Sequence, residues 1–330
     1  MIQERPVPPV EGGGTPEPLA RVLRQVGEVI LGKESVVRLA LVALLAEGHI
    51  LLEDVPGVGK TLLARALART IGCGFRRIQF TPDLLPADVT GAAIFNQKTR
   101  EFEFHPGPIF SEIVLADEIN RASPRTQSAL LEAMEEQSVT VDGVTYALPK
   151  PFLVMATQNP IEYEGTYPLP EAQLDRFLMR LHLGYPERSQ EMNILAQFRR
   201  QESERQLSAV LSVDELRQWQ VTASRVYVDD IMEGYIVDVV RATRRHPDVE
   251  LGASPRASLG LMRAAQAHAV TEGRDYVVPD DVQAVAKAVL AHRITLRPEA
   301  RYQDKESDGV VAEVLGQVEV PRGRGRVGRL

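Results

Sequence analysis

The hydrophobic positions of the first 184 residues form short apolar runs, separated by stretches in which they recur at helical spacing. Strands are expected at the start of 49–61 and over 75–80, 113–116, 152–157 and 177–183. Helices are expected over 18–30, 35–47, 61–72 and 126–136, with Ser35 as the N-cap of the second. Strands that alternate with helices predict an open parallel α/β sheet, whose ligand site lies at the carboxyl ends of the strands.

From Tyr185 onward the helical period dominates, so we predict a domain boundary near Gly184 and an all-helical second domain. Its expected helices cover 188–202, 213–221, 229–245, 255–272, 279–292 and 308–318, and Ser212 with Glu215 forms a capping box before the second of them. The predicted parts are a flexible tail (1–17), a core (18–184), a helical domain (185–320) and a basic tail (321–330).

Two hairpins are expected within the core. The runs 92–95 and 101–104 can pair with each other, and Asp142-Gly143 lies between alternating apolar runs in 138–148. An Asp-Gly pair in that setting is a strong signal for a two-residue hairpin turn.

The composition is that of an ordinary globular protein, with 44% hydrophobic and 25% charged residues. The single cysteine, Cys73, excludes an intrachain disulfide and fits a reducing, cytoplasmic compartment. The longest apolar run, 39–46, is too short to span a membrane, and the polar N-terminus does not resemble a signal peptide. A net charge of −7 argues against binding nucleic acid through a basic surface.

The stretch 49–61, HILLEDVPGVGKT, has the pattern of a phosphate-binding loop between a strand and a helix. Loop N–H groups and the helix N-terminus face an anion, Lys60 reaches the β and γ oxygens, and the Thr61 hydroxyl can bind magnesium. Gly57 and Gly59 permit the dihedral angles that such a loop needs. The usual first glycine is replaced by Asp54, which either weakens the loop or substitutes a different turn.

Candidate catalytic residues follow later strands. Asp117 would hold magnesium and Glu118 would orient and polarise the attacking water. Asn159 either hydrogen-bonds the γ-phosphate or the water, or simply begins a turn. Arg176 and Arg256 could neutralise charge on the γ-phosphoryl oxygens, although both also read as ordinary surface arginines.

Five segments together resemble, in their order and in their residues, the motifs of the MoxR-type AAA+ ATPases. They are EDVPGVGKT, IVLADEIN, ATQNP, LPEAQLDRFLMRL and GASPRASLGLMRAAQA, and the resemblance runs from about residue 19 to residue 321. It implies an αβα core with a parallel five-stranded sheet of order 5-1-4-3-2 and a smaller helical lid. It also implies a ring, usually hexameric, with ATP and Mg²⁺ bound between neighbouring subunits.

On this resemblance Asn159 corresponds to sensor 1, Arg256 to sensor 2 on the lid, and Arg176 to an arginine finger that reaches the neighbour's γ-phosphate. The hairpins would face the ring's pore or a partner. The residues implied in nucleotide binding are Ile30, Leu31, Gly32, Val55, Pro56, Gly57, Val58, Gly59, Lys60, Thr61 and Leu62.

The family resemblance implies a chaperone-like activity: remodelling partner proteins, or maturing their metal cofactors, with a von Willebrand factor A domain protein as the expected client. Two alternatives stay open, the motor subunit of a magnesium or cobalt chelatase and a nucleotide-gated scaffold that does not hydrolyse ATP. A nucleic-acid motor is disfavoured, because the hairpin segment 139–143 has no Lys or Arg to contact phosphates.

Overall fold

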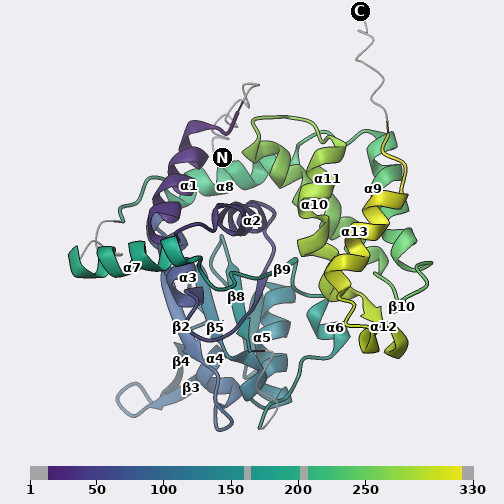
Figure 1. Cartoon of the computed structure of the whole chain (residues 1–330). Helices are drawn as coiled ribbons and strands as arrows, with labels where there is room; N and C mark the ends of the chain where they lie inside the picture. The colour runs from purple at the N-terminus through teal and green to yellow at the C-terminus, as the bar shows by residue number, and fades with distance from the viewer. Residues whose placement is uncertain (1–13, 160–164, 201–206, 322–330) are drawn as a thin grey trace, which may run out of the picture.

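A computed structural model describes residues 14–159, 165–200 and 207–321 (Figure 1). Its centre is a parallel five-stranded sheet in the order β2-β5-β8-β1-β9. The strands are β1 (Ile50–Glu53), β2 (Phe75–Gln79), β5 (Ile113–Asp117), β8 (Leu153–Gln158) and β9 (Met179–Leu181). Numbered along the chain, this is the order 5-1-4-3-2, so the expected sheet is confirmed.

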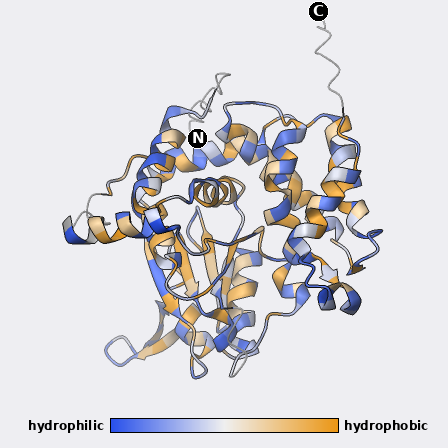
Figure 2. Cartoon of the chain, viewed as in Figure 1, coloured by the Kyte–Doolittle hydropathy of each residue, from blue (hydrophilic) through white to orange (hydrophobic). Residues whose placement is uncertain are grey.

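Successive residues of the central strands point into two separate apolar clusters. In β5, Ile113 and Leu115 join one cluster, whereas Val114 and Ala116 join the other. Both faces of the sheet are therefore covered, which explains why these strands are almost wholly apolar (Figure 2). The first cluster includes α1 (Glu17–Val29), α2 (Glu34–Leu45) and α3 (Lys60–Ile71), and the second includes α4 (Pro86–Thr90) and α5 (Pro124–Glu136).

Both predicted hairpins form, and the β3–β4 hairpin lies at the lower left of Figure 1, away from helices α9 to α13. β3 (Gly91–Asn96) pairs with β4 (Glu101–Pro106), and β6 (Ser138–Val141) pairs with β7 (Val144–Ala147). Asp142 and Gly143 both have positive φ, of 49° and 80°, as the tight turn between β6 and β7 requires.

The later part of the chain is helical and lies beside the sheet-containing core (Figure 1). The short helix α6 (Glu171–Leu174) precedes β9 and belongs to the core. The elements of the later part are α7 (Arg188–Arg200), α8 (Val213–Ser224), α9 (Asp230–Thr243), α10 (Pro255–Thr271), α11 (Pro279–Leu290), the short helix η3 (Ala291–Arg293), α12 (Pro298–Tyr302) and α13 (Ser307–Gln317). We call residues 207–321 the lid. It also contains a short ribbon, β10 (Val249–Leu251) with β11 (Thr295–Leu296), which the expectation of an all-helical domain did not include.

One apolar cluster joins the lid to the core, since it contains α1, α2 and α3 together with α8 to α13. Gln220 of α8 also donates a 2.8 Å hydrogen bond to the carbonyl of Leu44 at the end of α2. The division of the chain near Gly184 therefore stays a prediction, because no separate apolar core marks it. Every helix among the described residues is too short or too polar to cross a membrane.

Two predicted boundaries differ in detail. Ser35 does not cap α2, because the helix begins one residue earlier at Glu34, with Lys33 in the cap position. An acidic residue in the first turn is favoured by the helix dipole, which explains the earlier start. The first helix begins at Glu17, within the expected tail, whereas residues 1–13, 201–206 and 322–330 lie outside the described residues.

Candidate functional site

The glycine loop connects β1 to α3 at the carboxyl end of β1, which lies between β8 and β9 in the sheet. Gly57 and Gly59 have φ of 86° and 102°, so both need the freedom that only glycine has at low cost. Lys60 begins α3, and its Nζ donates to the carbonyls of Asp54 and Val55. The ammonium group thus lies over the loop, where phosphate oxygens could replace the two carbonyls as acceptors.

Asp54, which stands where the usual pattern has glycine, fixes the loop through its side chain. One carboxylate oxygen accepts the N–H of Val55 at 2.9 Å, and the other accepts the N–H of Gly184 at 2.6 Å. Its own N–H donates to the carbonyl of Gln158 on β8 at 3.2 Å. These contacts show how Asp54 holds the loop, and its effect on nucleotide binding stays a prediction.

The segment Ile30-Leu31-Gly32 reaches the same edge through contacts with the chain after β9. Lys33 donates to the carbonyl of Tyr185 at 3.0 Å, next to the Gly184 N–H that binds Asp54. Gly32 has φ of 69° and lies against Gln190 of α7. The segment expected to contact adenine is thus held beside the glycine loop.

The acid pair, Asp117 and Glu118, lies at the end of β5, which is the direct neighbour of β8 in the sheet. Thr157 donates from Oγ1 to Asp117 Oδ1 at 2.6 Å and accepts the N–H of Glu118 at 2.8 Å. Glu118 has a left-handed backbone, with φ of 57°, directly after the strand. Thr157 therefore fixes both acids, a role that the sequence analysis did not assign.

Two side chains of β2 also bind the acid pair. Arg77 contacts Asp117 Oδ2 through Nε at 2.9 Å and Nη2 at 2.6 Å, and Gln79 donates to Glu118 Oε2 at 2.7 Å. The sequence analysis missed both residues. Their alternation in FRRIQF was visible, but their approach to the acids depends on β2 being the neighbour of β5.

The donors at this edge fit a magnesium ion. Asp117 supplies a carboxylate and Thr61, the second residue of α3, supplies a hydroxyl, both oxygen ligands of the kind that Mg²⁺ prefers. Both carboxylate oxygens of Asp117 already accept hydrogen bonds, from Arg77 and Thr157. Because Mg²⁺ usually keeps several waters and uses few protein ligands, Asp117 could hold the ion through a water.

Asn159 follows β8, whose neighbours in the sheet are β5 and β1. It is buried and directly follows Gln158, the last residue of that strand. The residues expected to bind phosphate, the acid pair and Asn159 therefore all lie at the carboxyl edge of the sheet.

Arg176 and Arg256 lie at the opposite edge. Both contact Glu135 of α5 at 3.2 Å, and the chain after Arg176 enters β9 through a 2.8 Å bond from Leu178 N to His49 O. His49 precedes β1, whereas the glycine loop follows it, and the four residues of β1 separate them by about 13 Å at about 3.3 Å per residue. Neither arginine is placed beside its own chain's glycine loop.

A cleft of about 340 Å³ opens at this second edge. Four arginines line it, namely Arg176, Arg256, Arg263 and Arg293. Burial lowers the pKa of His49, which also lines the cleft, to about 4, so the positive charge there comes from the arginines. Three acidic residues, Glu47, Glu135 and Asp175, also line the cleft. Glu135 pairs with Arg176 and Arg256, and Asp175 pairs with Arg293, so an anion from another molecule would compete with Glu135 for the first two arginines.

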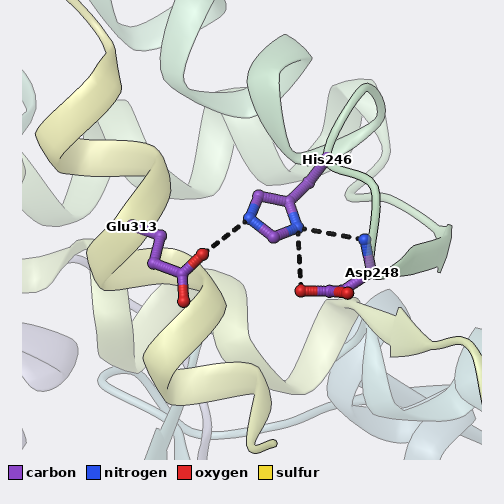
Figure 3. A group of neighbouring side chains, drawn as sticks. All are labelled: His246, Asp248 and Glu313. Carbon is purple, nitrogen blue, oxygen red and sulfur yellow. Dashed lines mark hydrogen bonds and ion pairs between the residues drawn. The ribbon is translucent and has the colours of Figure 1, made fainter. Parts of the chain in front are cut away.

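A second polar group lies in the lid and is formed by His246, Asp248 and Glu313 (Figure 3). His246 Nε2 is 3.1 Å from Glu313 Oε2, and Nδ1 accepts the N–H of Asp248 at 3.3 Å. Lys305 also contacts the Asp248 carboxylate. Since both ring nitrogens and the Asp248 charge already have partners, we assign this group to the packing of α13 rather than to metal binding.

Comparison with known proteins matches two parts of the chain to family models. Residues 49–179 match the ATPase family associated with various cellular activities, and residues 241–314 match an AAA lid domain. The first match ends at β9 and the second covers most of the lid, so both agree with the architecture described above.

Whole-length relatives agree with these matches. The chain is 54% identical to YeaC of Bacillus subtilis, over 94% of this chain and 97% of that protein. It is 45% identical to Chaperone MoxR1 of Mycobacterium tuberculosis, over 92% and 82%, and 32% identical to Protein MoxR of Methylorubrum extorquens, over 84% and 88%. A crystal structure of a candidate ATPase from Cytophaga hutchinsonii superimposes with a TM-score of 0.86 at 40% identity, covering 93% of this chain and 96% of that one.

Proposed function

Because this chain belongs to the MoxR-type AAA+ ATPases, we propose that it hydrolyses ATP at sites shared between neighbouring copies of itself and uses that energy to remodel partner proteins. One observation supports the shared site. The glycine loop and the acid pair lie at one edge of the sheet, whereas Arg176 and Arg256 lie at the other. A ring of copies, in the family's usual hexamer, would bring the two edges together.

In this site the chain's own residues divide the chemistry. The loop N–H groups and Lys60 bind the phosphates, and Thr61 with Asp117 would hold Mg²⁺, which neutralises charge on the phosphate oxygens when bound. Glu118 orients the attacking water and takes its proton, while Asn159 hydrogen-bonds the water or the γ-phosphate.

The next copy supplies the guanidinium groups. Arg176 and Arg256 would neutralise the charge that grows on the γ-phosphoryl oxygens during transfer. Their common partner Glu135 keeps them together at the cleft, with contacts of 3.2 Å to each. Before hydrolysis, the γ-phosphate would be contacted by both copies at the interface. Once ADP and phosphate form, this bridge is lost, and one copy can move relative to the next.

A protein client fits the exposed surface better than a nucleic acid does. The β3–β4 hairpin exposes Ile94, Phe95 and Phe102, the last with 72% of its surface accessible. Apolar side chains on an exposed hairpin favour contact with protein. We place the client among proteins with a von Willebrand factor A domain, whose metal cofactor would be matured in the cytoplasm, where ATP is available. Co-purification from the native cell, followed by identification of the bound protein, tests this assignment.

Chelatase motors and scaffolds that do not hydrolyse ATP remain the alternatives. The position of Glu118, held by Thr157 and Gln79 beside the glycine loop's edge, favours a hydrolytic site over a scaffold. ATP turnover by the purified chain separates a motor from a scaffold, and insertion of Mg²⁺ or Co²⁺ into a tetrapyrrole by the chain with its partners would identify a chelatase.

Two variants test the shared site. Arg176→Ala should lower kcat by about 10³-fold or more while ATP binding stays unchanged, because the lost group acts on the neighbour's transition state. Glu118→Gln should retain ATP without hydrolysing it. Rates come from phosphate release and binding from titration with a fluorescent ATP analogue, with the exposed Arg217→Ala of α8 as the control. Full-rate hydrolysis by Arg176→Ala, or by a monomeric form, would contradict the proposal.

A further inference from the structure

Arg293 is a buried arginine of the lid that binds the backbone on both sides of Arg176. It ends the short helix η3, and only 4% of its side chain is exposed. Nε donates to Asp175 Oδ1 at 2.6 Å, and Nη2 donates to the carbonyls of Asp175 at 3.2 Å and Phe177 at 2.7 Å. Nη1 donates to the carbonyl of Leu178 at 3.1 Å and to that of Val289.

All five N–H donors of this guanidinium are therefore used. Four of the five bonds end on residues 175–178, the segment that carries Arg176 from α6 into β9. Burial lowers the pKa of Arg293, while its bond to Asp175 opposes the shift. A planar fork with five donors can fix this irregular segment in a way that a lysine, with three donors, cannot.

Asp175 also connects this segment to the helix that carries Arg256. Its second oxygen, Oδ2, accepts from Ser254 Oγ at 3.3 Å, and Ser254 is the N-cap residue of α10. Glu135 then contacts both Arg176 and Arg256. The two arginines that face the cleft are thus joined through Asp175, Glu135 and Arg293, although one belongs to the core and the other to the lid.

We propose that Arg293 is a positioning residue, which holds Arg176 and Arg256 as one unit so that the position of the lid sets how both meet the neighbouring copy's nucleotide. This inference depends on the proposed function, in which the two arginines act across the interface. Misplacement of a catalytic group by about 1 Å can lower the rate about 100-fold. A small movement of the lid, passed through Arg293 to Arg176 and Arg256, is therefore sufficient to control hydrolysis.

The first test is Arg293→Lys, which keeps the charge and loses the fork. Its kcat should fall by about tenfold or more, whereas KM and ATP binding should stay within about twofold, because its own glycine loop is untouched. Arg297→Lys, an exposed arginine four residues later, is the matched control and should behave as the unchanged chain. A drop in ATP affinity that matches the drop in kcat would contradict a positioning role.

Mixed assemblies separate the inference from the proposed function. Glu118→Gln subunits cannot hydrolyse but carry correctly held arginines, so mixing them with Arg293→Lys subunits should restore hydrolysis at the Arg293→Lys glycine loops. The reference mixture is Arg176→Ala with Glu118→Gln. If ATP hydrolysis recovers in the reference mixture but not in the mixture with Arg293→Lys, the role of Arg293 is overturned while the shared site is supported. Failure of the reference mixture overturns the shared site itself.

Stability is followed in parallel by thermal unfolding. If Arg293→Lys does not fold, Asp175→Asn replaces it in the same mixtures. This change removes the charge of Asp175 from its contact with Arg293 but keeps a side-chain oxygen that can accept a hydrogen bond. Recovery with Glu118→Gln supports the inference for either variant. A folded Asp175→Asn chain with unchanged kcat overturns it.

Discussion

At the scale of single residues, the site combines side chains that a sequence motif reveals with others that only the sheet order brings close. Lys60, Asp117 and Glu118 follow from the spacing of the glycine loop and the later apolar strand. Arg77 and Thr157 could not be assigned in this way, since each is an ordinary strand residue until its neighbour in the sheet is known. The arginines of the second edge needed the same information, because their distance from the glycine loop depends on where the chain enters β9.

Thr157→Val tests whether the hydroxyl that joins the two acids matters for hydrolysis. The change keeps the shape but leaves Asp117 Oδ1 and the Glu118 N–H without their partner. Loss of such a supporting contact typically lowers activity by about 10–100-fold, and a buried group left unpaired costs about 1–3 kcal/mol of stability. Phosphate-release kinetics and chemical denaturation measure the two effects.

Thr70→Val is the matched control. Thr70 is also buried, but its hydroxyl has no hydrogen-bond partner among the described residues. Replacing it with an apolar group should therefore leave stability unchanged or slightly raised, with activity intact. Equal losses in both variants would show that Thr157 contributes only packing.

At the scale of elements, predictability depended on length and periodicity. The long lid helices and the two hairpins were predicted because each has several repeats of its period or a defined turn, such as Asp142-Gly143. The ribbon β10–β11 and the helix α12 were not, because two to five residues are too few to show a period. Tertiary contacts decide them, as when Arg297 N–H donates to the carbonyl of Asp248 at 2.9 Å.

The lid helices α10 and α11 are held together by a buried carboxylate, which provides a test at this scale. Asp281 is fully buried and contacts Arg274 through both oxygens and His268 Nδ1 at 2.7 Å. Burial raises the pKa of Asp281, but the bonds from Arg274 and His268 outweigh it and lower the pKa below the ordinary 3.8. Asp281→Asn should therefore cost about 3–5 kcal/mol near neutral pH, measured by urea denaturation.

The sign of the pH dependence follows from the lowered pKa. The stabilisation by Asp281 is present above its unfolded pKa of about 3.8 and is lost as the pH falls through the lower, folded value. The difference in unfolding free energy between the unchanged chain and Asp281→Asn should thus become smaller in acid. Asp280→Asn, the exposed neighbour, should change stability by no more than about 0.5 kcal/mol at any pH. A difference that stays constant in acid would assign the effect to packing instead of charge.

At the scale of the whole molecule, the glycine loop lies at one edge of the sheet and Arg176 and Arg256 lie at the other, so under the proposed function each chain depends on a neighbour for these two guanidinium groups. Rates should then depend on assembly. On dilution, ATP turnover per chain should fall together with the mass measured by light scattering, toward that of the 36.5 kDa chain, while ATP binding persists. Binding persists because the loop N–H groups and Lys60 come from one chain. A turnover per chain that stays constant once light scattering reports only monomers would mean that Arg176 and Arg256 are not needed by a neighbour, and that the site is complete within one copy.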